Sequence, residues 1–122
     1  MSNISCLPGN VFCIPRGDYM LFIITVVDEV GDLVDITSFI EIEYIVAASQ
    51  GGTIELTKKL TLGDVTIDGT GSAFTFEMTE VESKALSANI LYHECRLTNA
   101  SNEGQTVIAG TFRSPDTMLG TD

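Results

Sequence analysis

The order of apolar and polar residues along the chain predicts short β-strands separated by turns. The run from Tyr19 to Val27 is rich in β-branched and aromatic residues, which is typical of a strand buried on both faces. Residues 39–48 instead alternate apolar and acidic side chains, as a strand does when one face packs on a core and the other lies in water. These two segments therefore predict strands in different surroundings.

Turn residues define the remaining strands. Gly51-Gly52 is a hairpin signal, so residues 53–61 are expected to pair back onto residues 39–48. Glycine and asparagine clusters interrupt the chain again after residue 67 and after residue 98. Further short strands are predicted between these turns, at residues 65–67, 73–78, 90–98 and 105–113.

One short helix and an aromatic contribution to the core are also predicted. Phe74 and Phe76 alternate with polar residues and should face the core. Residues 79–82 (TEVE) match a capping box, which starts one or two helical turns that should close one end of the fold. Many short strands with a single helix predict an all-β fold, an antiparallel β-sandwich of about seven strands with one short helix.

Length and hydropathy favour one domain with an N-terminal arm. A chain of 122 residues with 44% hydrophobic residues can bury a core without disulfides or metals. We expect an extended arm over residues 1–15, a sandwich domain over 16–115 and a tail over 116–122, because the prolines and glycine near the N-terminus interrupt any regular pattern. The longest apolar run is too short to span a bilayer and lacks the flanks of a secretion signal, so we expect neither membrane association nor secretion.

Charge disfavours two classes of partner. Seventeen acidic and six basic residues give a net charge of −11, which repels nucleic acid and anionic membranes, although an acidic surface could also dock on a basic protein. Cys6, Cys13 and Cys95 have no metal-like spacing, and we interpret them as reduced thiols. A bridge between Cys6 and Cys13 is the less favoured alternative.

Three places carry residue types that can support chemistry, and no catalytic, cofactor or metal site is predicted at any of them. His93 and Cys95 share one face of a strand, as a nucleophile and its base would, but no orienting group or oxyanion site accompanies them. The acidic turn at residues 28–35 does not have EF-hand spacing, so a solvated turn is preferred over calcium. Arg16-Gly17-Asp18 is interpreted as the turn before a strand, rather than as an integrin-binding tripeptide.

Three long stretches of the chain combine strand and turn patterns: RGDYMLFIITVVDEVGDLVDIT, GSAFTFEMTEVESKAL and LYHECRLTNASNEGQTVIAGTFRS. In these stretches the chain resembles small immunoglobulin-like β-sandwich proteins of tailed-phage particles, including the N-terminal module of baseplate upper proteins. The resemblance covers roughly residues 16–115 and rests mostly on turn chemistry. The resemblance implies an Ig-like sandwich without catalytic residues or a cofactor.

The resemblance also implies a function in particle assembly. We expect a non-enzymatic virion structural protein, a capsid decoration or cement subunit, that is assembled in the host bacterial cytoplasm. Its partners would be the major capsid protein or other virion proteins and further copies of itself. A tail or baseplate adaptor that attaches a fibre is the first alternative. A host-surface or carbohydrate-binding module is the second, although the absence of tryptophan makes its aromatic signature weak.

The arm supplies the candidate partner-binding residues. It is too apolar for a fully solvated tail, yet too interrupted by proline for a regular element. Its apolar side chains therefore need a surface, which we expect to belong at least partly to a neighbouring subunit, the alternative being an arm that docks on its own domain. The expected contact residues are Ile4, Leu7, Val11, Phe12 and Ile14.

Overall fold

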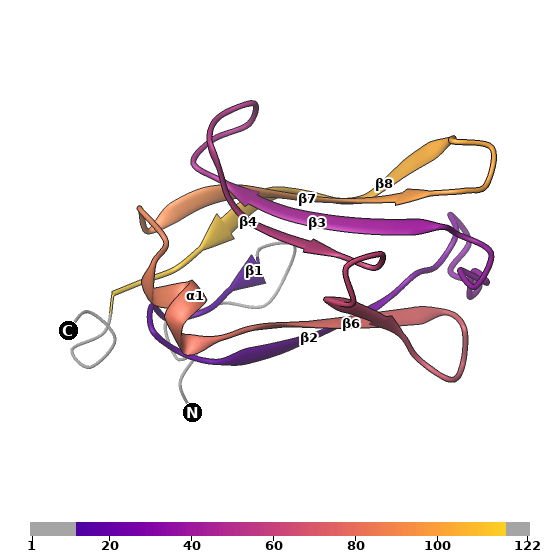
Figure 1. Ribbon diagram of the computed structural model, residues 1–122, viewed down its shortest axis with the longest axis horizontal. Helices are drawn as coiled ribbons and strands as arrows, with labels where there is room; N and C mark the ends of the chain where they lie inside the picture. The colour runs from indigo at the N-terminus through magenta and orange to yellow at the C-terminus, as the bar shows by residue number, and fades with distance from the viewer. Residues whose placement is uncertain (1–11, 117–122) are drawn as a thin grey trace.

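A computed structural model of the chain describes residues 12–116. Two β-sheets pack face to face in this range, and a single short helix lies at one end (Figure 1). The elements are β1 (Phe12–Cys13), β2 (Met20–Thr25), β3 (Glu41–Ala47), β4 (Ile54–Lys59), β5 (Val65–Ile67), β6 (Ala73–Met78), α1 (Glu80–Lys84), β7 (Ile90–Thr98) and β8 (Gly104–Arg113). The predicted all-β sandwich is therefore confirmed, and the two-residue β1 adds an eighth strand to the seven expected.

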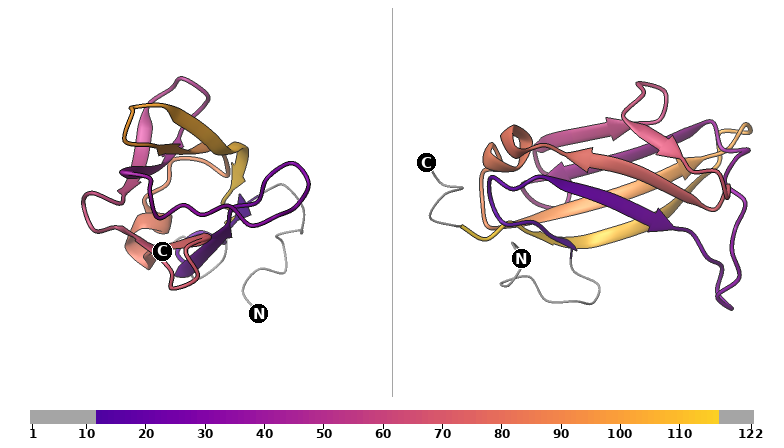
Figure 2. Two further views of the ribbon diagram at one scale, coloured as in Figure 1. Left: turned by 90° about the vertical axis from the view of Figure 1, so that its right-hand side faces the viewer. Right: turned by 90° about the horizontal axis from the view of Figure 1, so that it is seen from below.

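The strand order is that of an immunoglobulin-like sandwich. One sheet has the order β1-β8-β7-β3-β4 and the other the order β2-β6-β5. All neighbouring strands are antiparallel except β1 and β8, which run parallel. The strands β2, β6 and β5 take the places of B, E and D in an immunoglobulin domain, while β3, β7 and β8 take those of C, F and G. Figure 2 shows the two layers along and across the strands.

Aromatic rings from both sheets form the centre of the core. The ring centroids of Tyr44 and Phe76 lie 4.4 Å apart, and those of Phe22 and Phe76 lie 5.0 Å apart. Phe74 and Phe76 are 0% and 2% exposed, which confirms their predicted inward orientation. The alternation predicted for β3 is also confirmed, because Ile42 and Tyr44 are buried between less buried glutamates.

The helix begins as its sequence predicts. Thr79 is the N-cap, its side chain accepts a hydrogen bond from the Glu82 N–H, and the Glu82 carboxylate accepts one from the Thr79 N–H. This reciprocal pair satisfies two N–H groups that the first helical turn leaves without partners. The helix has only five residues, and no helix in the described range is long and apolar enough to cross a membrane.

The prediction that β2 is buried on both faces is wrong. Phe22 is buried, but Leu21 and Ile23 are 50% and 63% exposed. Only one face of the three-stranded sheet packs on the other sheet, because a two-layer sandwich gives every strand one inner and one outer face. A continuous apolar run in this fold must therefore place half of its side chains on the surface.

Residues 12–15, which the sequence analysis assigned to the arm, are part of the sandwich. β1 pairs with the last residues of β8, and the N–H of Ile14 donates to the Arg113 carbonyl over 3.0 Å. Cys13 is disulfide-bonded, whereas Cys95 is a free thiol, so the expectation of reduced cysteines is wrong for Cys13. Cys6, the partner in the less favoured alternative, lies outside the described residues.

Candidate interaction surface

The His93–Cys95 pair lies inside the core. His93 is 1% exposed and Cys95 is 0% exposed, so neither side chain reaches solvent or a substrate. A hydrogen bond of 2.9 Å joins the Tyr44 hydroxyl to His93 Nδ1. Burial lowers the pKa of His93 to about 4, and burial, with smaller contributions from Glu43 and Glu94, raises the pKa of Cys95 to about 12. At neutral pH the pair is a thiol beside a neutral imidazole, which is not an activated nucleophile.

The Arg16-Gly17-Asp18 tripeptide forms the turn before β2. Gly17 has a φ of 86°, and the N–H of Asp18 donates to the Pro15 carbonyl over 3.0 Å. The Arg16 guanidinium donates to Asp116 over 2.8 Å and also contacts the Leu86 carbonyl, which joins this turn to the segment after the helix. The arginine is thus used within the fold and is not presented to a receptor.

The acidic turn uses its carboxylates for its own backbone. Asp28 Oδ1 accepts hydrogen bonds from the N–H groups of Val30 and Asp32, both over 3.0 Å. Asp35 Oδ1 accepts from both the N–H and the hydroxyl of Thr37, and these bonds lower the pKa of Asp35. Within residues 12–116, no three His, Cys, Asp or Glu side chains are grouped so that they could hold a metal ion.

The candidate arm residues lie largely outside the described range. Ile4, Leu7 and Val11 are not among residues 12–116, and for Phe12 only the backbone pairing with β8 is described. Ile14 is 1% exposed within its own domain, so its side chain contacts the core and not a neighbouring subunit. For Ile14 the alternative of local docking is the correct one.

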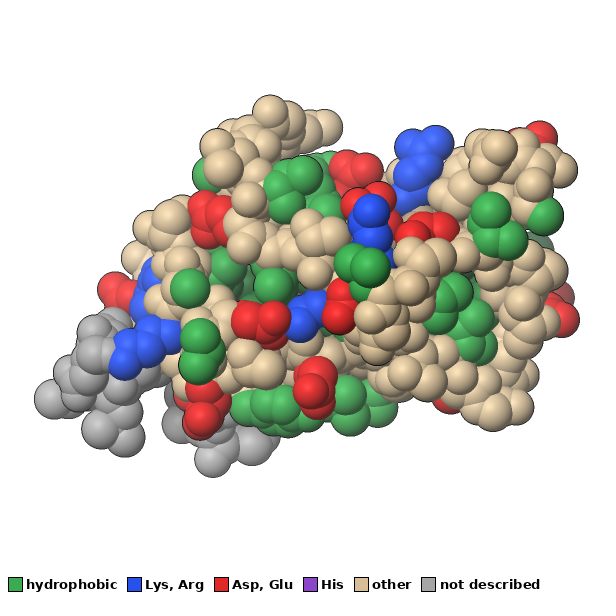
Figure 3. Space-filling model, viewed as in Figure 1, with side chains coloured by type: hydrophobic (Ala, Val, Ile, Leu, Met, Phe, Trp, Pro, Cys, Tyr) green, Lys and Arg blue, Asp and Glu red, His purple; other side chains and the backbone are tan. Residues whose placement is uncertain are grey.

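Exposed apolar side chains concentrate along β2 and the turn that follows it. Of the eleven large hydrophobic residues exposed in the described range, six come from residues 19–33 alone. In Figure 3 apolar side chains form a band along the lower edge of the molecule, where Figure 1 shows β2. We call the six residues the β2 flank; they are Tyr19, Leu21, Ile23, Val27, Val30 and Leu33.

The turn after β2 extends the flank towards one end of the sandwich. Val27 and Leu33 form an isolated bridge, and the N–H of Val34 donates to the Val26 carbonyl over 3.0 Å. Val30 is 80% exposed and Leu33 is 65% exposed. In Figure 1 this segment lies at the end opposite α1. A cluster of exposed apolar side chains of this kind is typical of a protein-binding surface.

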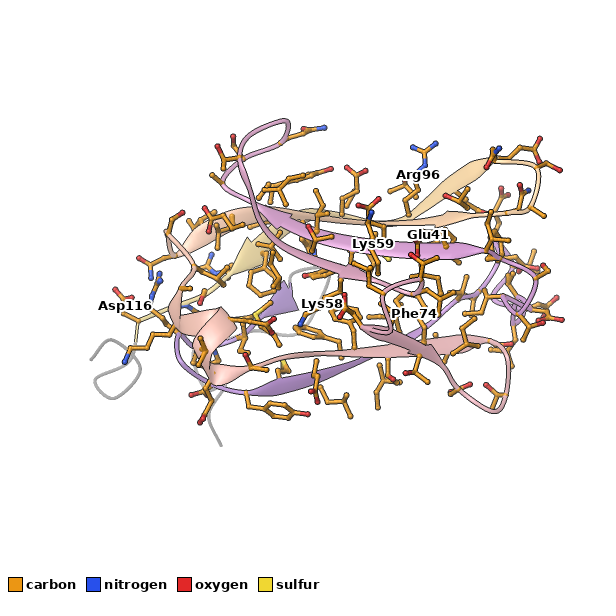
Figure 4. The ribbon with its side chains drawn as sticks, viewed as in Figure 1. Glu41, Lys58, Lys59, Phe74, Arg96 and Asp116 are labelled. Carbon is orange, nitrogen blue, oxygen red and sulfur yellow. The ribbon has the colours of Figure 1, made fainter. Side chains whose placement is uncertain are left out.

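Two hollows of the described surface each include a basic side chain, and in the first of them that side chain is already paired. One of about 330 Å³ lies where β4 approaches β5 and β6 and includes Lys58 among its lining residues. Figure 4 shows Lys58 between the two sheets. Its ammonium is held by the Glu82 carboxylate at 2.7 Å. Lys58 therefore forms an ion pair with Glu82 that joins β4 to α1, and this pair neutralises its charge.

The outer face of the larger sheet carries charged side chains of both signs among isoleucines. Lys59 Nζ lies 3.8 Å from Glu43 on the neighbouring strand, and Figure 4 shows Arg96 projecting outward from β7. Between these strands lies a hollow of about 160 Å³ lined by two glutamates, two isoleucines and Arg96. Mixed charges of this kind form a solvated face, which contrasts with the apolar β2 flank.

Sequence reasoning missed the β2 flank because it interpreted the run from Tyr19 to Val27 as fully buried. The predicted architecture itself contains the missing signal. A strand in a two-layer sandwich has one inner face, so alternate residues of an apolar run, such as Leu21 and Ile23, must face outward.

Comparison of the sequence with models of known protein families, and with curated proteins, finds no match.

Proposed function

We propose that this protein is a non-enzymatic structural component of a tailed-phage particle, where it decorates the capsid in many copies. The observation that carries the proposal is the β2 flank, an exposed apolar surface on an immunoglobulin-like sandwich. Such a surface favours attachment to other proteins. The sequence resemblance to phage sandwich modules directs the proposal to the virion.

Charge is consistent with attachment to protein and not to the packaged genome. The net charge is −11, and three of the six basic residues, Arg16, Lys58 and Lys59, form ion pairs with carboxylates. Nucleic-acid binding requires a continuous basic surface. The major capsid protein is accordingly the partner we propose.

Particle composition tests the proposal. Mass spectrometry of purified particles should find this protein at a copy number comparable to that of the major capsid protein. A few copies per particle would support the tail or baseplate adaptor instead, and absence from particles would refute a virion role.

A matched pair of variants tests the surface. Leu33→Asp places a charge in the β2 flank, whereas Leu62→Asp places the same charge at a residue of similar exposure, 69% against 65%, outside the flank. We expect Leu33→Asp to lower the copy number in particles and Leu62→Asp to leave it unchanged, with melting temperatures close to wild type for both. Equal incorporation of the two variants would exclude Leu33 as a contact.

A further inference from the structure

The edge of β2 is open within the described part of the chain. In the sheet order β2-β6-β5, β2 has a neighbour on one side only. The register with β6 runs without a shift from Met20–Met78 to Thr25–Ala73. An edge strand of this kind presents a row of backbone N–H and C=O groups that another strand can pair with.

The hydrogen bonds next to β2 show which residues point to the open edge. The N–H of Val26 donates to the Ser72 carbonyl over 2.9 Å, so the backbone N–H of Val26 points toward the β6 side. The Ala73 carbonyl accepts a hydrogen bond from the Asp68 N–H on the β5 side, so the backbone N–H and C=O groups of Ala73 point away from β2. Thr25 is paired with Ala73, so the backbone groups of Thr25 point away from β6. Because these directions alternate along a strand, the backbone groups of Leu21, Ile23 and Thr25 all point to the open edge.

The other strand edges of the described fold carry the features that discourage pairing. The terminal strand β1 has two residues and β5 has three. β4 carries the partly exposed Lys59 and has a register shift against β3. The part of β8 beyond β1 contains two glycines and has a register shift against β7. Short length, lysines and bulges are the means by which natural sheets prevent edge-to-edge association.

β2 has none of these features. Its six residues, MLFIIT, include no charge, proline or glycine, and their register is regular. Its outward side chains Leu21 and Ile23 are apolar and at least half exposed. Within residues 12–116, the other edges are protected and this apolar one is not, which is typical of a strand that pairs with a partner.

We infer that β2 pairs antiparallel with β2 of a second copy of this chain, which joins two three-stranded sheets into one sheet across a two-fold axis. With the axis at Ile23, that residue faces its own copy and Leu21 faces Thr25, so all three edge-facing N–H groups of each copy find a carbonyl. The inference concerns the isolated protein and goes beyond the proposed virion role.

Charge selects a second copy as the occupant. Two copies of a chain with a net charge of −11 can associate closely only through a segment without charges, and β2 is uncharged along its whole length. A basic partner would find no acidic group on the strand to pair with. The two copies still repel each other through their net charge, so association should strengthen as added salt screens that repulsion.

Sedimentation velocity over a range of concentrations tests the pairing. We expect a reversible monomer–dimer equilibrium that shifts toward the dimer between low and high NaCl. Ile23→Lys should weaken the dimer by about tenfold or more, because two lysines then face each other across the axis. Ile54→Lys, in the edge strand β4 of the other sheet and at 55% exposure, is the matched control and should leave the equilibrium unchanged.

A backbone variant separates strand pairing from simple apolar contact. Ile23→Pro removes an N–H that points to the open edge and is not used in the ladder with β6, so the fold should survive while the dimer is lost. Should proline at this position unfold the domain, amide exchange on the wild type gives the same information. Raising the protein concentration should then slow exchange at Leu21, Ile23 and Thr25 but not at Phe22, whose N–H faces β6.

Several results would overturn the inference. A wild type that stays monomeric at all concentrations and salt levels would do so, as would a dimer that Ile23→Lys does not weaken. A third result would also do so: a dimer that is lost when residues 2–11 are deleted but persists in Ile23→Lys. That result would show that the N-terminal segment, and not the edge of β2, forms the contact between copies. None of these measurements depends on whether the protein enters particles, so the virion proposal stands or falls separately.

Discussion

At the scale of single residues, the core depends on rings contributed by both sheets. Phe76 lies between Tyr44 of the facing sheet and Phe22 of its own sheet, with ring centroids 4.4 Å and 5.0 Å away. A ring in this position gives up dispersion contacts on both sides when it is removed. The position of Phe76 between the two layers was predictable because its strand alternates cleanly between apolar and polar residues.

Replacing Phe76 by alanine should destabilise the domain by about 3–5 kcal/mol, since it removes a buried ring and leaves a cavity. Chemical denaturation monitored by circular dichroism measures the change. Val81→Ala, at a residue that is 78% exposed, is the control and should stay within about 0.5 kcal/mol of wild type. A Phe76→Ala variant as stable as the control would contradict the packing described above.

His93 should make stability depend on pH. Burial lowers its pKa from 6.5 to about 4, so the unfolded chain takes up a proton at higher pH than the folded one. Stability is therefore full above pH 6.5 and is lost as the pH falls toward 4, by about 3 kcal/mol over the whole window. Carboxylates add their own loss only near the lower end of this range.

The His93→Asn variant isolates this contribution, because asparagine does not titrate and can still offer a polar atom to Tyr44. Denaturation at several pH values between 5 and 7 should give a positive slope of stability against pH for wild type and a flat profile for the variant. Parallel slopes in the two proteins would show that His93 is not the titrating group.

At the scale of elements, α1 depends on its cap. The helix is too short to be stable through propensity alone, and Thr79 and Glu82 close its first turn. Burial raises the pKa of the Glu82 carboxyl, but the hydrogen bonds from Lys58 and from the Thr79 N–H and side chain outweigh it and lower the pKa overall. One carboxylate thus joins the helix to both its own cap and β4.

Thr79→Ala removes the side chain that accepts from the Glu82 N–H and should cost about 1 kcal/mol. Thr53→Ala, at an exposed loop threonine, is the matched control and should be close to neutral. The midpoints of urea denaturation of the two variants give the comparison. If the two midpoints were equal, the cap would contribute nothing measurable.

The elements also show how far the sequence alone leads. β5, β6 and β7 have the bounds that their alternation and flanking turns predicted, because both signals are local. The burial of β2 was mispredicted, since whether a strand has one or two covered faces depends on the number of layers and not on the strand itself. The membership of β1 in the sandwich was missed for a similar reason: two residues that pair with β8 across a hundred positions leave no periodic signal.

The candidate surface was less predictable than the fold. Ile14 was expected to meet a neighbouring subunit, but apolar character alone cannot distinguish a residue that docks on its own core from one that docks on a partner. Leu21 and Ile23 became candidates only when the sheet order placed them on an uncovered face. His93 and Cys95 share one face of β7, as the alternation predicts, and that face is the buried one.

At the scale of the whole molecule, charge is the dominant feature. Seventeen acidic residues against six basic ones give −11, and self-repulsion of this size opposes the compact state. The carboxylates at residues 28–35 add to the repulsion, although Asp28 and Asp35 also accept hydrogen bonds from their own turn. Screening of this repulsion should therefore stabilise the fold without any specific ion.

Calcium tests whether the acidic turn does more than repel. Adding NaCl should raise the melting temperature modestly, because screening weakens repulsion among the carboxylates. Calcium chloride at matched ionic strength should raise it no further, since residues 12–116 contain no grouping of three carboxylates fit to hold a metal ion. Scanning calorimetry with sodium, calcium and chelator measures the difference. A rise specific to calcium, abolished by Asp28→Asn but not by the distant Asp64→Asn, would instead show that the turn rearranges to bind the ion.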